Sequence, residues 1–166
     1  MSKQKYFFGT RSKRVKETLH EDLQLILDLT INRTYTDVGL HEGARSIETQ
    51  RKYFKDGKSR INPDMYVSKH DLCKLAKHIV IPGDTYFGKS RAVDLHVSER
   101  HGDTKLTWDK AHLCYLAGVI QSCAQELYEK GLVSHLVRWG GDWNMNGIIS
   151  LDQSLDDLVH FELYIP

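Results

Sequence analysis

Residues 92–97 form an apolar run that carries an aspartate, Asp94, near its centre. Apolar residues alternate with Asp94 and His96, which is the pattern of a half-buried β-strand. A lone carboxylate is costly to bury, so Asp94 must be hydrogen-bonded, paired with a cation or bound to a metal ion. The chain must therefore adopt a fold that brings such a partner to the strand.

Histidine is a candidate partner for Asp94, because the chain contains nine histidines. In the strand predicted at 159–165, His160 and Glu162 share one face, and Asp157 stands three residues before His160. A metal ligand beside a carboxylate that acts as a general base fits these residues. A surface aspartate beside a half-buried histidine fits them too.

The cysteine pattern does not indicate a metal site with sulfur ligands. There are three, widely spaced and with no CxxC pair: Cys73, Cys114 and Cys123. This pattern fits buried free thiols better than a disulfide framework or a thiolate zinc site.

The remaining periodicities predict an α+β fold. Helices are expected at 15–31 (with Ser12 as N-cap), 46–56, 71–80 and 108–130, and strands at 36–40, 92–97, 136–139 and 159–165. No repeat or proline-rich linker divides the 166 residues. We therefore expect one domain over 1–166, a small antiparallel sheet with packed helices.

Charge and hydropathy exclude several classes of protein. The formal net charge is +1, which argues against binding nucleic acid through bulk positive charge. No run approaches the roughly 18 apolar residues of a membrane span, so no membrane insertion is expected. The polar, basic start has no apolar segment typical of a secretory signal, which predicts a cytoplasmic location. A monomer is the default expectation.

Several short motifs follow one another in a specific order. They are Gly43–Ser46, Gln50, Lys55–Gly57, Ser68–His70, Ala92–Asp94, Trp139–Trp143 and Asp157–His160. Over about residues 36–166 this ordered set resembles the LAS-type zinc peptidases. These include D-Ala-D-Ala carboxypeptidases and, more similar to this chain, the L-alanyl-D-glutamate peptidases that phages use as endolysins. The resemblance implies the LAS-peptidase (hedgehog/D-Ala-D-Ala carboxypeptidase-like) fold.

The resemblance also implies a role for individual residues. The zinc ligands would be His70, Asp94 and His160, and Asp157 would be the general base. Arg45 would steady the substrate carbonyl, since a fixed cation favours the negative charge that grows in the transition state. Ser68 would help to hold the substrate or the site loop.

The spacing of the first two ligands departs from the family pattern. The family has six residues between its first histidine and the aspartate, whereas 23 separate His70 from Asp94. We interpret about 71–90 as an insertion, which costs little closure entropy in a surface loop. His78, inside the insertion, and His96 are the alternatives to His70.

A second ion site is predicted at 142–152, which begins like an EF-hand loop. Oxygen-bearing side chains occupy positions 1, 3 and 5, glycine occupies position 6, and an aspartate precedes position 12. The expected calcium ligands are Asp142, Asn144, Asn146, Ile148 and Asp152. An Asn/Gly-rich turn without an ion is the alternative.

Trp139 and Trp143 flank Gly140 and Gly141, where Trp139 forms either a wall of the substrate cleft or part of the core. The candidate ligands and the resemblance together predict a zinc metallopeptidase. The resemblance implies an endolysin that cuts the L-alanyl-D-glutamate bond of the peptidoglycan stem peptide, regulated by Ca²⁺ and held in the host bacterial cytoplasm before lysis. The alternatives are a D-Ala-D-Ala carboxypeptidase, a non-catalytic cell-wall-binding module and a calcium-responsive structural protein.

Overall fold

The computed structural model describes residues 5–98, 107–149 and 152–166. Its elements are α1 (Thr10–Glu17), α2 (Glu21–Arg33), β1 (Val38–Glu42), α3 (Ile47–Lys55), the 3-10 turn η1 (Pro63–Met65), α4 (Lys69–Leu75), β2 (Ala92–Val97), α5 (Lys110–Glu129), β3 (Leu136–Trp139) and β4 (His160–Tyr164). The strands form one antiparallel sheet in the order β1-β2-β4-β3, which confirms the α+β prediction.

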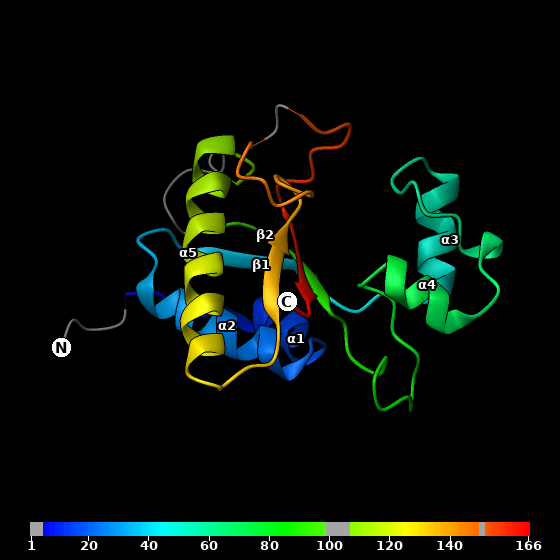
Figure 1. The fold of residues 1–166 in the computed structure, drawn as a ribbon, viewed down its shortest axis with the longest axis horizontal. Coiled ribbons are helices and arrows are strands. Elements are labelled where there is room, and N and C mark those ends of the chain that lie inside the picture. The colour runs from blue at the N-terminus through cyan, green and yellow to red at the C-terminus, as the bar shows by residue number, and fades with distance from the viewer. Residues whose placement is uncertain (1–4, 99–106, 150–151) are drawn as a thin grey trace.

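One face of the sheet carries the main core. Val93 and Leu95 of β2 and Phe161 and Leu163 of β4 are fully buried there, in one cluster with apolar residues of α2 and α5. In Figure 1 the long helix α5 lies beside the sheet and close to α2. Because side chains alternate along a strand, burial of these four residues directs their neighbours to the opposite face.

The opposite face of the sheet is polar. Asp94 of β2 lies directly opposite His160 of β4, and Glu162 of β4 lies opposite Arg138 of β3. A β-bulge between Leu40 and Glu42 shifts the alternation of β1 by one residue, so that Glu42 pairs with Asp94. The sheet therefore gathers charged side chains from all four strands on the face that the core helices do not cover.

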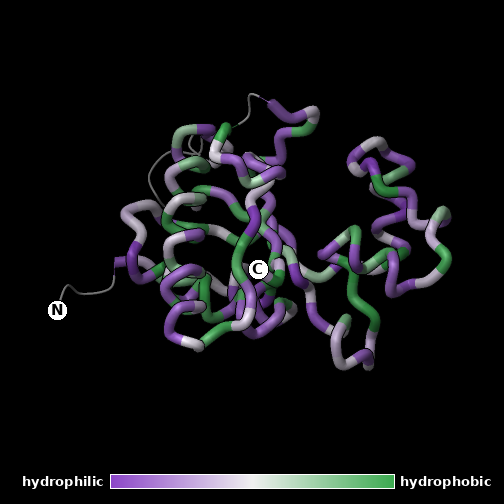
Figure 2. The backbone as a smooth tube through the Cα atoms, viewed as in Figure 1, coloured by the Kyte–Doolittle hydropathy of each residue, from purple (hydrophilic) through white to green (hydrophobic). Residues whose placement is uncertain are grey.

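A smaller lobe stands apart from the sheet (Figure 1) and contains α3, η1 and α4. Figure 2 shows apolar stretches both in the sheet layer and within this lobe. The lobe has its own buried cluster: Leu72, Cys73, Ala76, Ile79 and Phe87. A parallel bridge between Arg45 and Ile79 joins the two ends of the lobe where it meets the sheet.

The predicted helix at 15–31 is broken in the structure. Helix α1 ends at Glu17, and a backbone bridge between Leu19 and Ser90 interrupts the helical hydrogen bonds. His20 then caps α2, its Nδ1 accepting a hydrogen bond from the amide of Asp22. Ser12 is not the N-cap; it lies inside α1, and its hydroxyl accepts a hydrogen bond from the amide of Leu40.

The other predicted elements agree more closely. β2 and β3 have the predicted bounds, and Ser46 caps α3. Helix α4 replaces the helix predicted at 71–80: it begins at Lys69 and ends at Leu75, so His78 lies beyond it. All three cysteines are free thiols, and no helix of the described residues is long and apolar enough to cross a membrane.

Candidate metal centre and substrate cleft

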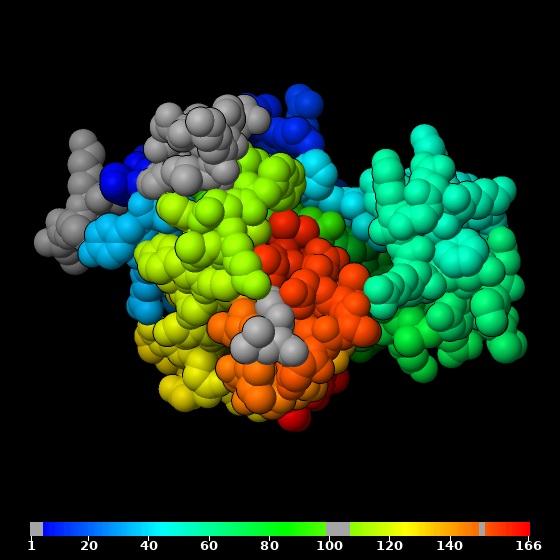
Figure 3. Space-filling model, turned by 90° about the horizontal axis from the view of Figure 1, so that it is seen from above, coloured from blue at the N-terminus to red at the C-terminus, as the bar shows by residue number. Residues whose placement is uncertain are grey.

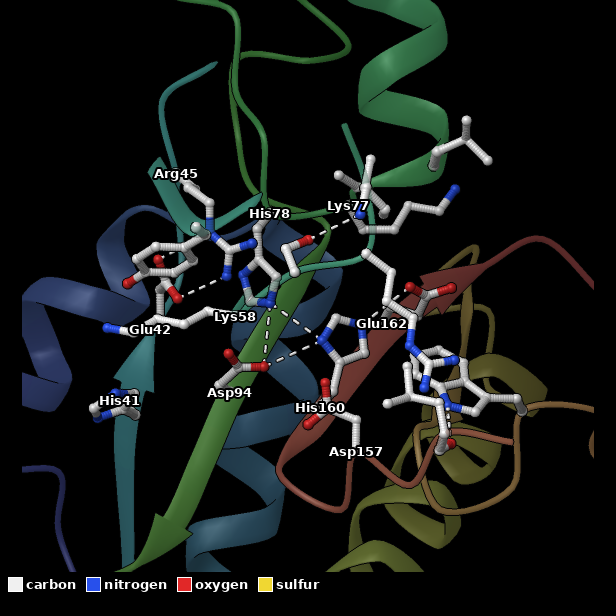
Figure 4. A pocket seen from close by; sticks show the side chains of 18 of the residues that line it. His41, Glu42, Arg45, Lys58, Lys77, His78, Asp94, Asp157, His160 and Glu162 are labelled. Atoms are coloured by element: carbon white, nitrogen blue, oxygen red, sulfur yellow. Dashed lines mark hydrogen bonds and ion pairs between the residues drawn. The ribbon is translucent and has the colours of Figure 1, made fainter. Parts of the chain in front are cut away.

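Three side chains converge on the polar face of the sheet (Figure 4): His78 from the lobe, Asp94 from β2 and His160 from β4. His78 Nε2 is 3.2 Å and His160 Nδ1 is 3.1 Å from Asp94 Oδ1, and the two ring nitrogens are 3.2 Å apart. The histidines are only 3% and 8% exposed. Three potential ligand atoms thus face one buried point.

The outer nitrogen of each ring fixes its orientation. His78 Nδ1 lies 2.7 Å from the carbonyl oxygen of Gly43, which can only accept a hydrogen bond. His160 Nε2 lies 3.1 Å from a carboxylate oxygen of Glu162. With these outer nitrogens as donors, the lone pairs of His78 Nε2 and His160 Nδ1 point at each other and at Asp94.

This arrangement fits a zinc ion. Zinc bonds of 2.0–2.1 Å to nitrogen and similar bonds to oxygen place neighbouring tetrahedral ligands about 3.3 Å apart. The three observed separations of 3.1–3.2 Å are close to that value. Two histidines and one carboxylate are also a known ligand set for catalytic zinc.

The electrostatics favour a positive charge at the same point. Burial alone would raise the pKa of Asp94, but His78 and His160 hold that pKa well below its usual range. Burial lowers the pKa of His160, yet the contacts with Asp94 and Glu162 outweigh it and raise the pKa to about 9. The cluster therefore retains a proton at neutral pH when no metal ion is bound.

The cluster lies in a cavity of about 700 Å³. In the space-filling view the surface is hollowed between the lobe and the C-terminal segment (Figure 3). The lining residues come from both sides: His41, Glu42, Arg45, Tyr53, Gly57, Lys58, Ser59, Arg60, Ile61, Leu75, Ala76, Lys77, His78, Asp94, Arg138, Trp143, Leu155, Asp157, His160 and Glu162. The cavity is large enough for several residues of a peptide.

Asp157, the general base that the resemblance implies, lies beside the three converging side chains (Figure 4). Its backbone is held at both ends, because its amide donates to Gly140 and its carbonyl accepts from the amide of His160. Burial, followed by the negative charge of Asp94, raises the pKa of Asp157 above its usual value. A carboxylate with a raised pKa is suited to accept a proton from water.

Arg45 also lines the cavity, on the opposite side of His78 from His160 (Figure 4). Its Nε and Nη2 donate to the carboxylate of Glu42 at 3.0 and 2.7 Å, and Nη1 donates to Gln50 at 2.8 Å. The guanidinium stacks over the ring of Tyr53. These contacts use three of the five N–H donors and leave two for a substrate.

The structure does not bring His70 to this cluster. Helix α4 carries His70 on the exposed surface of the lobe, where its Nε2 lies 2.9 Å from Asp84. The chain returns to the sheet only at His78, the alternative that lay inside the predicted insertion. His96 does not join the cluster either: its Nδ1 contacts the carbonyl of Val97, and its ring packs over Gly39.

Two expected substrate contacts are also placed elsewhere. Ser68 is the N-cap of α4, where its hydroxyl accepts from the amide of Asp71, and it does not line the cavity. Trp139 is 2% exposed and donates from Nε1 to the carbonyl of Leu158, so it belongs to the core. Trp143 lines the cavity instead.

The sequence left several cavity residues without a role, above all Glu162, Arg138 and Lys77. The alternation of side chains along β4 places Glu162 on the same face as His160, and this pattern could have predicted the contact between the two residues. Arg138 lies on the same polar face and forms an ion pair with Glu162. No local pattern indicates Lys77, since its position depends on the path of the chain between α4 and the sheet.

The predicted calcium loop forms a network of side-chain hydrogen bonds. Asp142 accepts from the amides of Asn146 and Gly147, and the side-chain amides of Asn144 and Asn146 donate to Asp152. The amide of Ile148 donates to Asn146 Oδ1. Positions 150 and 151 of the loop lie outside the described residues.

One comparison with known proteins shows the family of the chain, and another shows a similar fold. The family model described as phage L-alanyl-D-glutamate peptidase matches residues 4–164. No curated protein sequence matches the chain significantly. Among solved structures, the fold is similar to that of the Serratia marcescens L-Ala D-Glu endopeptidase ChiX. The TM-score is 0.63 at 20% identity, over 97% of this chain and 91% of that one.

Proposed function

Because the chain belongs to the phage L-alanyl-D-glutamate peptidase family, we propose that it is a zinc-dependent endopeptidase that cuts the L-alanyl-D-glutamate bond of peptidoglycan stem peptides. The observation that carries the proposal is the convergence of His78 Nε2, Asp94 Oδ1 and His160 Nδ1 beside Asp157 in a cavity of peptide size. We assign these three atoms as the zinc ligands, with His78 in place of His70.

The zinc ion and the groups of the protein would have separate roles in the reaction. A zinc ion held by these ligands would polarise the scissile carbonyl and lower the pKa of a bound water. The Asp157 carboxylate accepts a proton from the attacking water and returns it to the departing amine. The free donors of Arg45 stabilise the negative charge that develops on the carbonyl oxygen. Glu162 holds the tautomer of His160, and the Gly43 carbonyl does the same for His78.

A four-protein comparison tests this assignment. Wild type, His78→Ala, His70→Ala and Asp157→Asn are purified, their zinc content is measured by mass spectrometry, and each is incubated with a synthetic stem peptide. We expect wild type and His70→Ala to bind one zinc and cut the peptide, His78→Ala to lose both properties, and Asp157→Asn to keep zinc without cutting. Loss of zinc in His70→Ala with retention in His78→Ala would reverse the assignment.

The cleavage products distinguish the rival reaction. An endopeptidase releases a peptide with glutamate as its new N-terminus, whereas a D-Ala-D-Ala carboxypeptidase releases free alanine. A non-catalytic wall-binding module would bind the peptide and leave it intact. Mass spectrometry of the same incubations separates the three outcomes.

We also propose that Ca²⁺ binds the loop at 142–152 and regulates the site. Both carboxylates of this loop lie in one hydrogen-bonded network, through Asn146. Gly140, two residues before the loop, forms backbone hydrogen bonds with both Asp157 and His160, so ordering of the loop would be transmitted to the proposed base and to a proposed ligand. Calcium added to EGTA-stripped, zinc-loaded enzyme should raise the melting temperature and the cleavage rate, and Asp142→Asn should abolish both responses.

Lysis of the host is the proposed biological role, with the bacterial cell wall as the target and a monomer as the active form. Co-expression with a membrane-permeabilising protein in bacteria tests it. Wild type should lyse the culture and Asp157→Asn should not; equal lysis by both would contradict the proposal.

A further inference from the structure

The proposed substrate contains a charge that the catalytic groups leave without a partner. Glutamate has two carboxyl groups, and a stem peptide uses at most one of them to bond to the following residue. An unmodified substrate therefore presents a free carboxylate next to the scissile bond. A binding cavity for this peptide is expected to supply a cation for it.

Both arginines of the cavity that lie next to the proposed metal ligands are already engaged in ion pairs. Arg45 is paired with Glu42 and Gln50. Arg138 is paired with Glu162, which also accepts from His160, and stacks on Trp143. The two N–H donors that Arg45 keeps free are assigned to the scissile carbonyl, and Arg138 cannot bind a new carboxylate without weakening its contact with Glu162.

Lys77 differs from these arginines. It lines the cavity, and in the part of the chain that the structure describes no acidic side chain forms an ion pair with it. It is half-buried, whereas the other cavity cations outside ion pairs, Lys58 and Arg60, are exposed. The charge of Glu162 acts on Lys77 without forming an ion pair, so the half-buried ammonium is only partly neutralised in the free protein and is stabilised further when an anion binds beside it.

The position of Lys77 is fixed relative to the metal ligands. It precedes His78 directly, and its carbonyl accepts from the amide of Arg91, the residue before β2. In Figure 4 Lys77 and Glu162 lie on one side of His78, and Arg45 and Glu42 lie on the other. A peptide that places its scissile carbonyl near Arg45 therefore has a second cation on the far side of the cluster.

We propose that Lys77 binds the free carboxylate of the substrate's glutamate and so makes the enzyme selective for the unmodified residue over its amide. The inference rests on the proposed function, because it names the part of that substrate which this side chain recognises. Lys77 acts here as a specificity residue and takes no part in the proton transfers assigned to Asp157.

Two peptides that differ in one group test the proposal. One contains glutamate with its free carboxylate, and in the other this carboxylate is replaced by a carboxamide. Binding of both to the zinc-free protein is measured by calorimetry, and kcat and KM are measured with the zinc-loaded enzyme. The proteins are wild type, Lys77→Gln, Lys77→Arg and, as matched control, Lys74→Gln, which changes an exposed lysine of α4 outside the cavity.

Wild type and Lys74→Gln should bind the carboxylate peptide about 10- to 100-fold more tightly than the amide, which is the range for a charge-assisted hydrogen bond. Lys77→Gln should bring this ratio close to one by raising KM for the carboxylate peptide, whereas the control Lys74→Gln should keep the wild-type kcat and KM for both peptides. Lys77→Arg should restore part of the preference. Equal binding of the two peptides by wild type, or an unchanged ratio in Lys77→Gln, would overturn the inference.

The two readouts separate this inference from the proposed function. Preferential binding of the carboxylate peptide that depends on Lys77, without cleavage of either peptide, supports the inference and refutes the endopeptidase proposal. Cleavage of both peptides at equal efficiency supports the endopeptidase and refutes the role of Lys77.

Discussion

Replacing Glu162 with glutamine isolates the contribution of a residue that touches a zinc ligand without being one. Glu162 is 4% exposed, and it accepts from His160 Nε2 at 3.1 Å and from Nε of Arg138 at 3.1 Å. The substitution Glu162→Gln keeps the size and one acceptor oxygen but removes the charge. It therefore tests the carboxylate and not the space it occupies.

The expected effect is a moderate loss of zinc affinity. Burial raises the pKa of Glu162, but the hydrogen bond and the charge of His160, together with Arg138, hold that pKa below its usual value, so the carboxylate is charged in the folded protein. A charged acceptor makes the bonded imidazole a better ligand, and loss of such a contact typically costs 10- to 100-fold in metal affinity. This corresponds to about 1.4–2.7 kcal/mol. Arg138 is one-third exposed, so water can replace part of its lost contact.

Competition with a chromophoric zinc chelator gives the dissociation constants of wild type and variant. Glu129→Gln, an exposed change on α5 far from the sheet's polar face, is the control and should bind zinc like wild type. An unchanged constant in Glu162→Gln would refute the view that Glu162 orients His160. A complete loss of zinc, as expected for His78→Ala, would show that Glu162 is itself a ligand.

Three further predictions concern the proposed base, the main core and the lobe. Asp157→Asn should lower kcat by about 10²–10⁴-fold in a stem-peptide assay while zinc content stays at the wild-type level; a smaller loss would assign the base elsewhere. Leu116→Ala, in the fully buried face of α5, should cost about 2–5 kcal/mol of unfolding free energy by urea titration, with zinc binding retained. Hydrogen bonds from the amide of Phe87, from His70 and from the amide of Tyr86 lower the pKa of Asp84 to about 2 from 3.8. Because the pKa of Asp84 is lower in the folded protein than in the unfolded chain, the charged carboxylate stabilises the fold above pH 3.8. This stabilisation is lost as the pH falls towards 2. The melting-temperature difference between wild type and Asp84→Asn should therefore shrink over that interval, and a constant difference would contradict this reason.

The sequence predicts the strands well because their alternation is a local property. Asp94 and His96 interrupt an otherwise apolar run, and the bounds of β2 follow directly from it. The helix predicted at 15–31 fails because its break is caused by Ser90, which is remote in sequence and pairs with the backbone around Leu19. A period of 3.6 residues carries no information about such a bridge.

In the candidate site, too, some residues can be predicted from local motifs and others depend on long-range contacts. The order of motifs is sufficient to place Arg45, Asp94, Asp157 and His160 around one cavity. It does not distinguish His70 from His78, because that choice depends on where the chain leaves the lobe. The bulge in β1, which turns Glu42 towards Arg45 on the polar face, is likewise absent from any local pattern.

The proposed metal centre joins two separately packed parts of the molecule. Asp94 and His160 are held opposite each other by strand pairing over the main core, so their geometry is set by the register of β2 and β4. His78 comes from the lobe, which packs on its own cluster and meets the sheet through backbone bonds on either side of Arg45. Those bonds join His78 O to the amide of Arg45, and the carbonyl of Arg45 to the amide of Val80. The third ligand and the proposed oxyanion donor are thus positioned by the same pair of hydrogen bonds. A shift of the lobe against the sheet would therefore change metal ligation and substrate stabilisation together.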